Sequence, residues 1–214
     1  MKLLREYIRV LLTEAAMGPD ELPDGVFVTI EADDGYEVYY SDKSGKRIST
    51  YQKYPTTKNP LHGYVAMDKG HRGRGLGHCL GAYMVIGSEA THGWGPMLYD
   101  IIIELAGSSG LMADRQSLSK DAYNIWQHYM NSRSDVVKKQ LDDERNTLTP
   151  DEEDNCDMDT AIQRSGLTTK DLFSSEWSDE DTAELLKDSP IMKVYTKGPT
   201  TIQQLEAMGR LIRK

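Results

Sequence analysis

The chain is poor in cysteine and lacks a long apolar run, and each shortage excludes a class of protein. Its 214 residues include two cysteines, Cys79 and Cys156, which lie far apart in the sequence. Two such residues make neither a disulfide framework nor a zinc-binding pattern, so we expect two unrelated free thiols and a reducing compartment. No apolar run approaches the ~20 residues that cross a bilayer, so we expect no membrane-spanning helix.

Positive charge is also scarce. Lysine and arginine number 25 against 34 aspartates and glutamates, and the formal net charge is -9. An acidic balance repels phosphate backbones, so we do not expect nucleic acid as a partner, and it favours a cationic or amine-bearing one. The length and the ordinary apolar and charged fractions predict one globular domain, with or without a short appendage.

The appendage is predicted at residues 1–18, before a domain that spans residues 24–214. Apolar residues recur there at helical spacing from Leu4 to Ala15, and charged residues interrupt them. This pattern predicts an amphipathic helix rather than an export signal, because an export signal needs an uninterrupted apolar core. Amphipathic helices usually pack on their own domain, which is one interpretation of the segment.

A second interpretation comes from the residues around Glu14. The segment begins Met-Lys and carries Leu12-Thr13-Glu14 before the small residue Ala15. It resembles the capsid-targeting peptides of internal head proteins in large tailed bacteriophages, which end at a protease site of this form. The resemblance implies a protein that meets the phage capsid during assembly, is trimmed after Glu14 and is packaged in the virion; a viral protein that is not packaged would remain in the host cytoplasm.

Turn residues divide the rest of the chain into short strands and helices. Runs rich in β-branched and aromatic residues predict strands at 26–30, 36–40, 47–51 and 63–67, the first three as an antiparallel meander. The centre is predicted to hold a buried strand in 78–87, a loop at 88–95, a helix at 96–106, a strand at 111–115 and a helix from its cap Ser119 to Met130. Farther on we expect a helix from Thr149, a strand at 191–195 and a helix at 202–212.

A glycine loop before the central helix is the first candidate binding element. Gly93-Trp94-Gly95 directly precedes Pro96. Backbone N–H groups and the positive end of the helix dipole can surround an anion such as a pyrophosphate there. A second glycine loop, Arg72 to Gly77, has no helix directly after it, so we interpret it as a basic loop near the site, with the phosphate cradle as its alternative.

The order of strand, glycine loop, helix, strand and helix over residues 79–130 resembles the cofactor-binding core of the GNAT N-acetyltransferases. Residues 90–95 correspond to the family's Arg/Gln-x-x-Gly-x-Gly/Ala loop, with Ala90 where Arg or Gln is usual. In the second helix, Ser119, Ala122 and Trp126 stand where the family has Asn, Ala and Tyr. The resemblance implies an α+β fold in which helices flank a mixed, mostly antiparallel sheet with a V-shaped opening between its two central strands.

The same resemblance implies an acyl-CoA-dependent N-acyltransferase, with acetyl-CoA or a related donor and an amine-bearing small molecule or protein as acceptor. Backbone N–H groups around 84–87 would polarise the thioester carbonyl. The cofactor contacts implied in this way are Met84, Val85, Ile86, His92, Gly93, Trp94, Gly95, Ser119, Ala122 and Trp126.

The chemistry also needs a base for the amine and an acid for the departing thiolate. Glu89, at the end of the strand, is the candidate base, although exposed glutamates are usually solvated. Trp126 cannot donate a phenolic proton, so Tyr129 or Tyr123 would have to act as the acid. Trp126 also fits a core position, given its helical spacing.

Three further interpretations stay open. Asp114 and Arg115, at a strand end, are substrate contacts or an ordinary surface pair. The acidic cluster at 151–159 lacks the glycine and spacing of a calcium loop, so we expect no metal site. Because Ala90 and Trp126 depart from the family pattern, the alternative to the enzyme is a catalytically inactive GNAT-like protein that acts inside a virion or on a host partner.

Overall fold

The computed structural model describes residues 16–48, 61–69, 76–115, 118–142, 148–157 and 187–214. The expected N-terminal helix, the cleavage site after Glu14 and most of the basic loop before Gly77 lie outside these residues. Of the strand expected at 47–51, Arg47 forms an isolated bridge with Ser41, and the run beyond Ile48 is outside the described part.

A single sheet organises the described chain, with strand order β6-β7-β5-β4-β3-β2-β1-β8. Neighbouring strands are parallel at β4–β5 and β1–β8 and antiparallel elsewhere. The expected α+β fold with a mixed, mostly antiparallel sheet is therefore confirmed. The strands are β1 (Phe27–Asp33), β2 (Gly35–Ser41), β3 (Gly63–Asp68), β4 (Tyr83–Ala90), β5 (Leu111–Met112), β6 (Val136–Gln140), β7 (Lys193–Lys197) and β8 (Leu211–Arg213).

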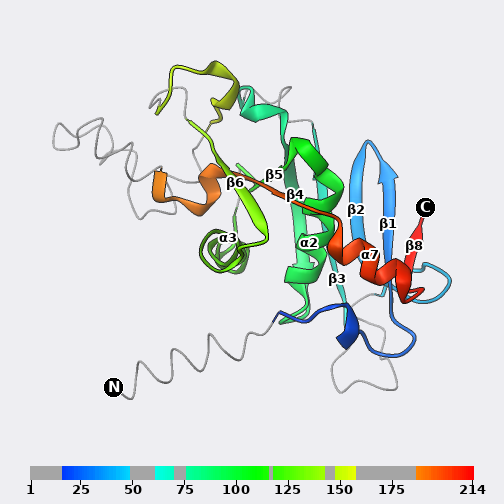
Figure 1. Ribbon diagram of the computed structural model, residues 1–214. Helices are drawn as coiled ribbons and strands as arrows, with labels where there is room; N and C mark the ends of the chain where they lie inside the picture. Colours follow the sequence, from blue (N-terminus) through cyan, green and yellow to red (C-terminus); the bar gives the residue numbers. More distant parts are fainter. Residues whose placement is uncertain (1–15, 49–60, 70–75, 116–117, 143–147, 158–186) are drawn as a thin grey trace, which may run out of the picture.

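Within the described ranges, three α-helices flank this sheet: α2 (Gly95–Ala106), α3 (Lys120–Ser132) and α7 (Thr200–Ala207). Helix α2 packs against β2, β3 and β7 and crosses in front of the sheet in Figure 1, with α7 beside it. Most of its apolar residues are buried, namely Met97, Leu98, Tyr99, Ile101, Ile102 and Ile103, and Leu105 is partly buried. A helix that is apolar on nearly every side is a core element rather than a surface one.

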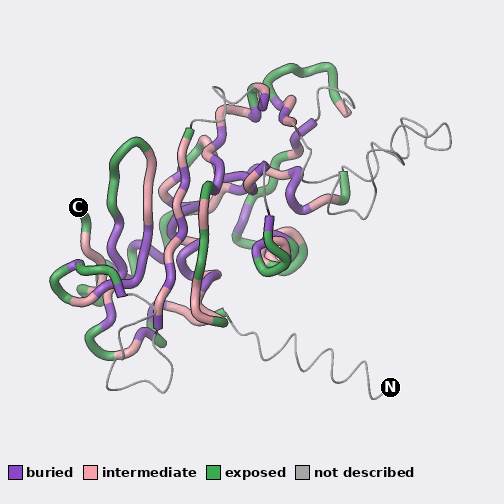
Figure 2. The backbone as a smooth tube through the Cα atoms, turned by 180° about the vertical axis from the view of Figure 1, so that it is seen from behind, coloured by how far each residue is buried: buried purple, intermediate pink, exposed green. Residues whose placement is uncertain are grey.

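The inner face of the sheet follows the period-two pattern that predicted the strands. In β3 the buried residues Val65 and Met67 alternate with half-exposed neighbours. Figure 2 shows the buried backbone running through the middle of the sheet, whereas the β1–β2 turn around Asp33 is exposed.

Several element boundaries differ from the expectations. Residues 88–90 continue β4 instead of forming a loop, and β5 stops at Met112. The helix expected from Thr149 is a single 3-10 turn at Glu152–Asp154, and β6 was not expected.

The C-terminal helix is also shorter than expected. It ends at Ala207, Gly209 takes a left-handed φ of 64°, and Leu211–Arg213 pairs in parallel with β1 as β8. A glycine in this conformation ends a helix readily. Arg210 then fixes the new direction, because its guanidinium donates to the carbonyls of Pro23 and Val26 at 3.1 and 2.9 Å.

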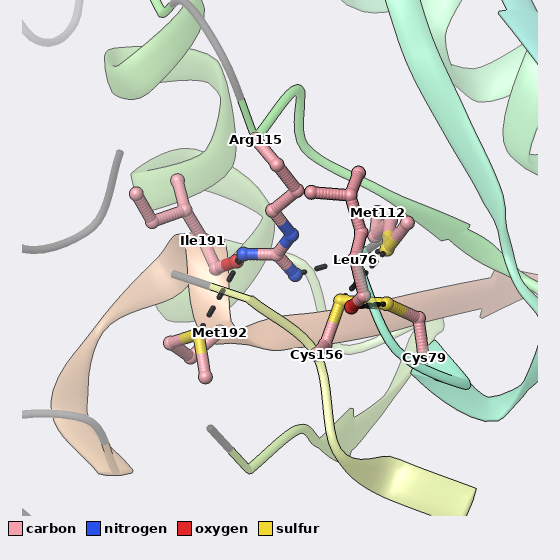
Figure 3. The surroundings of a disulfide bond; sticks show 7 residues. All are labelled: Leu76, Cys79, Met112, Arg115, Cys156, Ile191 and Met192. Carbon is pink, nitrogen blue, oxygen red and sulfur yellow. Dashed lines mark hydrogen bonds between the residues drawn. A yellow bond between two sulfur atoms is a disulfide. The ribbon is translucent and has the colours of Figure 1, made fainter. Parts of the chain in front are cut away.

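The expectation of two free thiols is wrong. Cys79 and Cys156, 77 positions apart, form a disulfide, and both residues are fully buried (Figure 3). The bond connects the turn before β4 to the chain that follows Glu152–Asp154. The spacing of two isolated cysteines holds no information about such a contact, and the argument for a reducing compartment loses its basis.

Within the described ranges, no helix combines the length and the apolar character that crossing a membrane requires.

A buried carboxylate joins α2 to α7. Glu104 Oε1 and Oε2 accept from the backbone N–H groups of Thr201 and Ile202, each at 2.8 Å, and Lys197 Nζ pairs with Oε1. No side chain of α7's own N-cap, Pro199, caps that helix, so Glu104 supplies the cap from another element. Both charged side chains are almost completely buried, at 0% exposure for Glu104 and 3% for Lys197.

We expect Glu104→Ala to lower the free energy of unfolding by about 3–5 kcal/mol. The substitution leaves the buried ammonium of Lys197 without its carboxylate and leaves two N–H groups of α7 without an acceptor. Urea denaturation followed by circular dichroism measures this change. Glu206→Ala is the matched control, since Glu206 forms an exposed ion pair with Arg213 and its loss should cost less than about 1 kcal/mol. Equal effects of the two substitutions would contradict the capping role.

Candidate functional site

Strands β4 and β5 pair over a short distance and then part. Their parallel register consists of Tyr83 with Leu111 and Met84 with Met112. Strand β4 continues to Ala90, whereas β5 ends at Met112, so within the described residues no strand pairs with Val85–Ala90 on that side. We call the point marked by Met84 and Met112 the strand fork. Beyond the fork, the backbone of β4 has an edge that can hydrogen-bond to a ligand.

A β-bulge follows the fork directly. On β3, Ala66 pairs with Gly87 and Met67 with Val85, which leaves Ile86 as the extra residue of β4. Ile86 is 43% exposed, whereas Met84 and Val85 are buried. Bulges twist a strand and redirect its groups, and they are common beside active sites. Of the predicted contacts on β4, Met84 and Val85 can therefore offer only backbone groups to a ligand.

The glycine loop leads from β4 into α2. Gly93 has a φ of 82°, and the N–H of Trp94 closes the turn on Thr91 O at 3.0 Å. Trp94 is the N-cap residue, and no side chain caps the helix. Gly95 is buried, and a Cβ on it would lie 3.4 Å from Ile125 Cδ1 of α3. The turn uses the N–H of Trp94 and Pro96 has none, so Gly95 and Met97 supply the first N–H groups of α2 that can face an anion, in a loop with little room for side chains.

Two contacts hold this loop from outside. The backbone N–H of Met17 donates to Gly93 O at 3.0 Å, and the Tyr40 hydroxyl donates to Trp94 O at 2.8 Å. The Trp94 ring meets Tyr40 edge to face, with centroids 5.9 Å apart. Both contacts use carbonyl oxygens, so they position the loop without consuming its N–H groups. His92 is exposed beside them.

Glu89 belongs to a chain of polar groups at the end of β4. Its Oε1 lies 3.3 Å from His62 Nε2, and the Thr91 hydroxyl lies 3.0 Å from His62 Nδ1. The arrangement fits an imidazole that donates from Nε2 to the carboxylate and accepts at Nδ1 from the hydroxyl. Sequence reasoning missed His62. Its position just before β3 was the available signal, because Gly63, the first residue of β3, pairs with Ala90 and so brings His62 to the end of β4.

A second polar group of the site joins α2 to β4. The Tyr99 hydroxyl donates to Ser88 Oγ at 3.1 Å, so α2 contacts β4 beyond the bulge. Burial raises the pKa of Tyr99 to about 12, and the carboxylate of Asp114, which follows β5, acts in the same direction. Sequence reasoning left Asp114 as a substrate contact or a member of a surface pair, and it missed Ser88 and Tyr99, which lie on different elements, β4 and α2.

Helix α3 holds its predicted residues in a different way. Ser119 is the N-cap, and its Oγ accepts from the N–H of Ala122 at 3.1 Å. Trp126 is fully buried and stacks on Tyr195, with ring centroids 5.0 Å apart. The core interpretation of Trp126 therefore fits the structure better than a cofactor contact.

Tyr129 is fully buried as well. Its hydroxyl donates to Asp100 Oδ1 at 2.6 Å and to Pro96 O at 3.1 Å, and Arg133 pairs with the same carboxylate. Burial and the Asp100 charge raise the pKa of Tyr129 well above its usual range. Tyr129 thus joins α3 to α2 and is poorly placed as an acid; Tyr123, on the same helix, is half-buried.

Arg115 is not part of a surface pair. It is 2% exposed, and one guanidinium nitrogen donates to Ile191 O at 2.6 Å (Figure 3). A buried guanidinium bound to a backbone carbonyl is a structural element, which leaves Asp114 as the better substrate-contact candidate of the two. Across the described ranges, no group of three or more His, Cys, Asp or Glu residues is arranged to hold a metal ion.

The raised pKa of Tyr99 predicts a pH dependence of stability. Its neutral form is favoured in the folded chain, so its contribution is complete below pH 10 and is lost as pH rises through about 12. Between about pH 8 and about pH 11.5, ionisation of Tyr99 in the unfolded chain should lower the free energy of unfolding by about 2 kcal/mol, because roughly 1.5 pH units above the ordinary pKa cost about 1.36 kcal/mol each, and Tyr99→Phe should not show this loss. Chemical denaturation of both proteins at these two pH values measures the difference; identical losses in both proteins would contradict the assignment.

The candidate site thus consists of the strand fork, the bulge at Ile86, the uncapped glycine loop, and two polar groups centred on His62 and Tyr99. Comparison of the chain with protein-family models, with curated proteins and with solved structures finds no match.

Proposed function

We propose that the chain is an N-acyltransferase that uses acetyl-CoA or a related acyl-CoA. The observation that carries the proposal is the strand fork followed by a glycine loop at an uncapped helix N-terminus. An extended ligand with an amide-rich arm and a phosphate end would find two things there: the unpaired β4 edge for its amides, and N–H groups for its phosphates.

Named residues would hold the parts of such a cofactor. The backbone of Val85–Ala90 would bind the pantetheine arm, and Gly93–Gly95 would bind the pyrophosphate, with Ser119 and Ala122 at the N-terminus of α3 completing the predicted contacts. The bound cofactor supplies an activated acyl group as a thioester. Backbone N–H groups near the Ile86 bulge would polarise its carbonyl, and fixed donors of this kind need no reorganisation during the reaction.

The acceptor must lose a proton before it attacks. Glu89 and His62 are in contact and could share this role, with the carboxylate orienting the imidazole and balancing its charge. Asp114, beyond the end of β5, would attract a cationic amine, in keeping with the net charge of -9. Since Tyr129 is committed to Asp100, Tyr123 is the tyrosine proposed as the acid.

One observation favours the alternative of an inactive GNAT-like protein with a virion-internal or host-interaction role. Position 126, where the resemblance expects an acidic hydroxyl, carries a tryptophan that the structure uses as core. Such a protein could retain the phosphate loop without catalysis. The expected targeting peptide lies outside the described residues, so packaging in a phage head stays a prediction.

Isothermal titration with CoA and acetyl-CoA tests the proposal. We expect binding in the micromolar range, weakened about tenfold by Gly93→Ala, since alanine at a φ of 82° distorts the loop that presents the N–H groups. Gly25→Ala is the matched control: it has a similar φ of 79°, and its Cβ would meet nothing within 4 Å. Absence of binding, or an equal loss of affinity in both variants, would contradict the cofactor assignment.

A further inference from the structure

The disulfide lies directly behind the strand fork. Cys156 Sγ is 3.6 Å from Met112 Sδ, and Met112 is the last residue of β5 and the partner of Met84 (Figure 3). Cys79 begins the 3-10 turn Cys79–Gly81 that leads into β4. The bond therefore braces both strands at the place where they part.

The turn that carries Cys79 is strained. Cys79 and Leu80 have φ values of 48° and 54°, and they are the non-glycine residues with positive φ in the described chain. L-residues with side chains avoid this left-handed region, so two in succession persist only where their surroundings hold them there. The disulfide is one restraint, and others include backbone bonds of 2.9 Å from Cys79 N to Asn155 O and from Asp157 N to Leu76 O.

A buried arginine connects this region to the turn before β7, on the other side of β5. Arg115 places one guanidinium nitrogen 3.8 Å from Met112 Sδ and another 2.6 Å from Ile191 O (Figure 3). Ile191 belongs to the turn Pro190–Met192 that runs directly into β7, the other neighbour of β5. A displacement of Met112 would therefore affect its pairing with β4 on one side and, through Arg115, the start of β7 on the other.

We propose that the Cys79–Cys156 disulfide is a redox-controlled clamp on the strand fork. A dithiol reductant breaks the S–S bond through a mixed disulfide: the dithiol becomes a cyclic disulfide, and two electrons and two protons go to the cysteines, which become thiols. Without the cross-link, the left-handed turn relaxes and the segment around Cys156 leaves Met112. The fork then loosens, while β1–β3 keep their own ladder.

A disulfide that only stabilised the whole fold would, on reduction, destabilise all segments alike, whereas the clamp predicts a change confined to the residues around the fork. Both cysteines are fully buried, so a reductant reaches them only after the strained turn opens locally. The turn and the fork should therefore respond together, at residues 76–84, 111–115, 152–157 and 189–193. The pairing of β1 with β2 and of β2 with β3 involves none of these residues.

Hydrogen exchange of the full chain, followed by mass spectrometry before and after dithiothreitol treatment, tests the clamp. We expect amide exchange in those four segments to rise at least about tenfold on reduction, to return on reoxidation, and to stay unchanged in β1 and β2. The double variant Cys79→Ser, Cys156→Ser is the matched control; it should resemble the reduced protein and not respond to dithiothreitol. Unchanged exchange, or an equal rise throughout the chain, would overturn the clamp.

Titration of both redox forms with CoA adds a second arm, which rests on the proposed function. A loosened fork should weaken CoA binding by about tenfold or more, since the β4 edge is no longer fixed. Equal affinity of the two forms would overturn the link between the clamp and the site. If neither form binds CoA, the acyltransferase proposal fails, and the exchange experiment still decides the clamp by itself.

Discussion

The fold depends on how α2 is held against its neighbours, and the buried interaction of Glu104 with Lys197 and the N-terminus of α7 is central to this. Nearly all of α2 is apolar, so this helix needs cover on several sides, and α7 supplies part of it. A carboxylate buried at 0% exposure would be very costly alone, but here it caps α7 and neutralises Lys197. The same helix begins at the glycine loop, so the element that anchors the core also positions the first N–H groups of the candidate site.

The candidate site is built from the ends of elements. The strand fork is where β5 stops, the glycine loop is where β4 gives way to α2, and Asp114 follows β5 directly. Two of these ends have named supports: Tyr40 and Met17 bind the glycine loop, and the disulfide and Arg115 contact Met112 at the fork. The polar groups near the strand fork therefore lie on elements that several contacts hold in place, and a preorganised binding site needs such support.

Local signals made the central helices predictable, and distant partners explain what was missed. Pro96 and Ser119 mark the starts of α2 and α3 through backbone chemistry that involves only their neighbours. The Tyr99–Ser88, His62–Glu89 and Cys79–Cys156 contacts join positions that nothing in a single sequence connects. The same holds for β8, since Leu211–Arg213 reads as the end of a helix until β1 is seen beside it.

Synthesis on the ribosome gives the Glu104 cap a further meaning. The carboxylate of Glu104 is translated long before Lys197, Thr201 and Ile202, and strand β1 long before β8. Until residues 197–213 have emerged, the acid of α2 has no partner and the outer edge of β1 has no neighbour. During synthesis, α2 is therefore incompletely packed until α7 and β7 have emerged. Apolar surface exposed in this way is what chaperones bind.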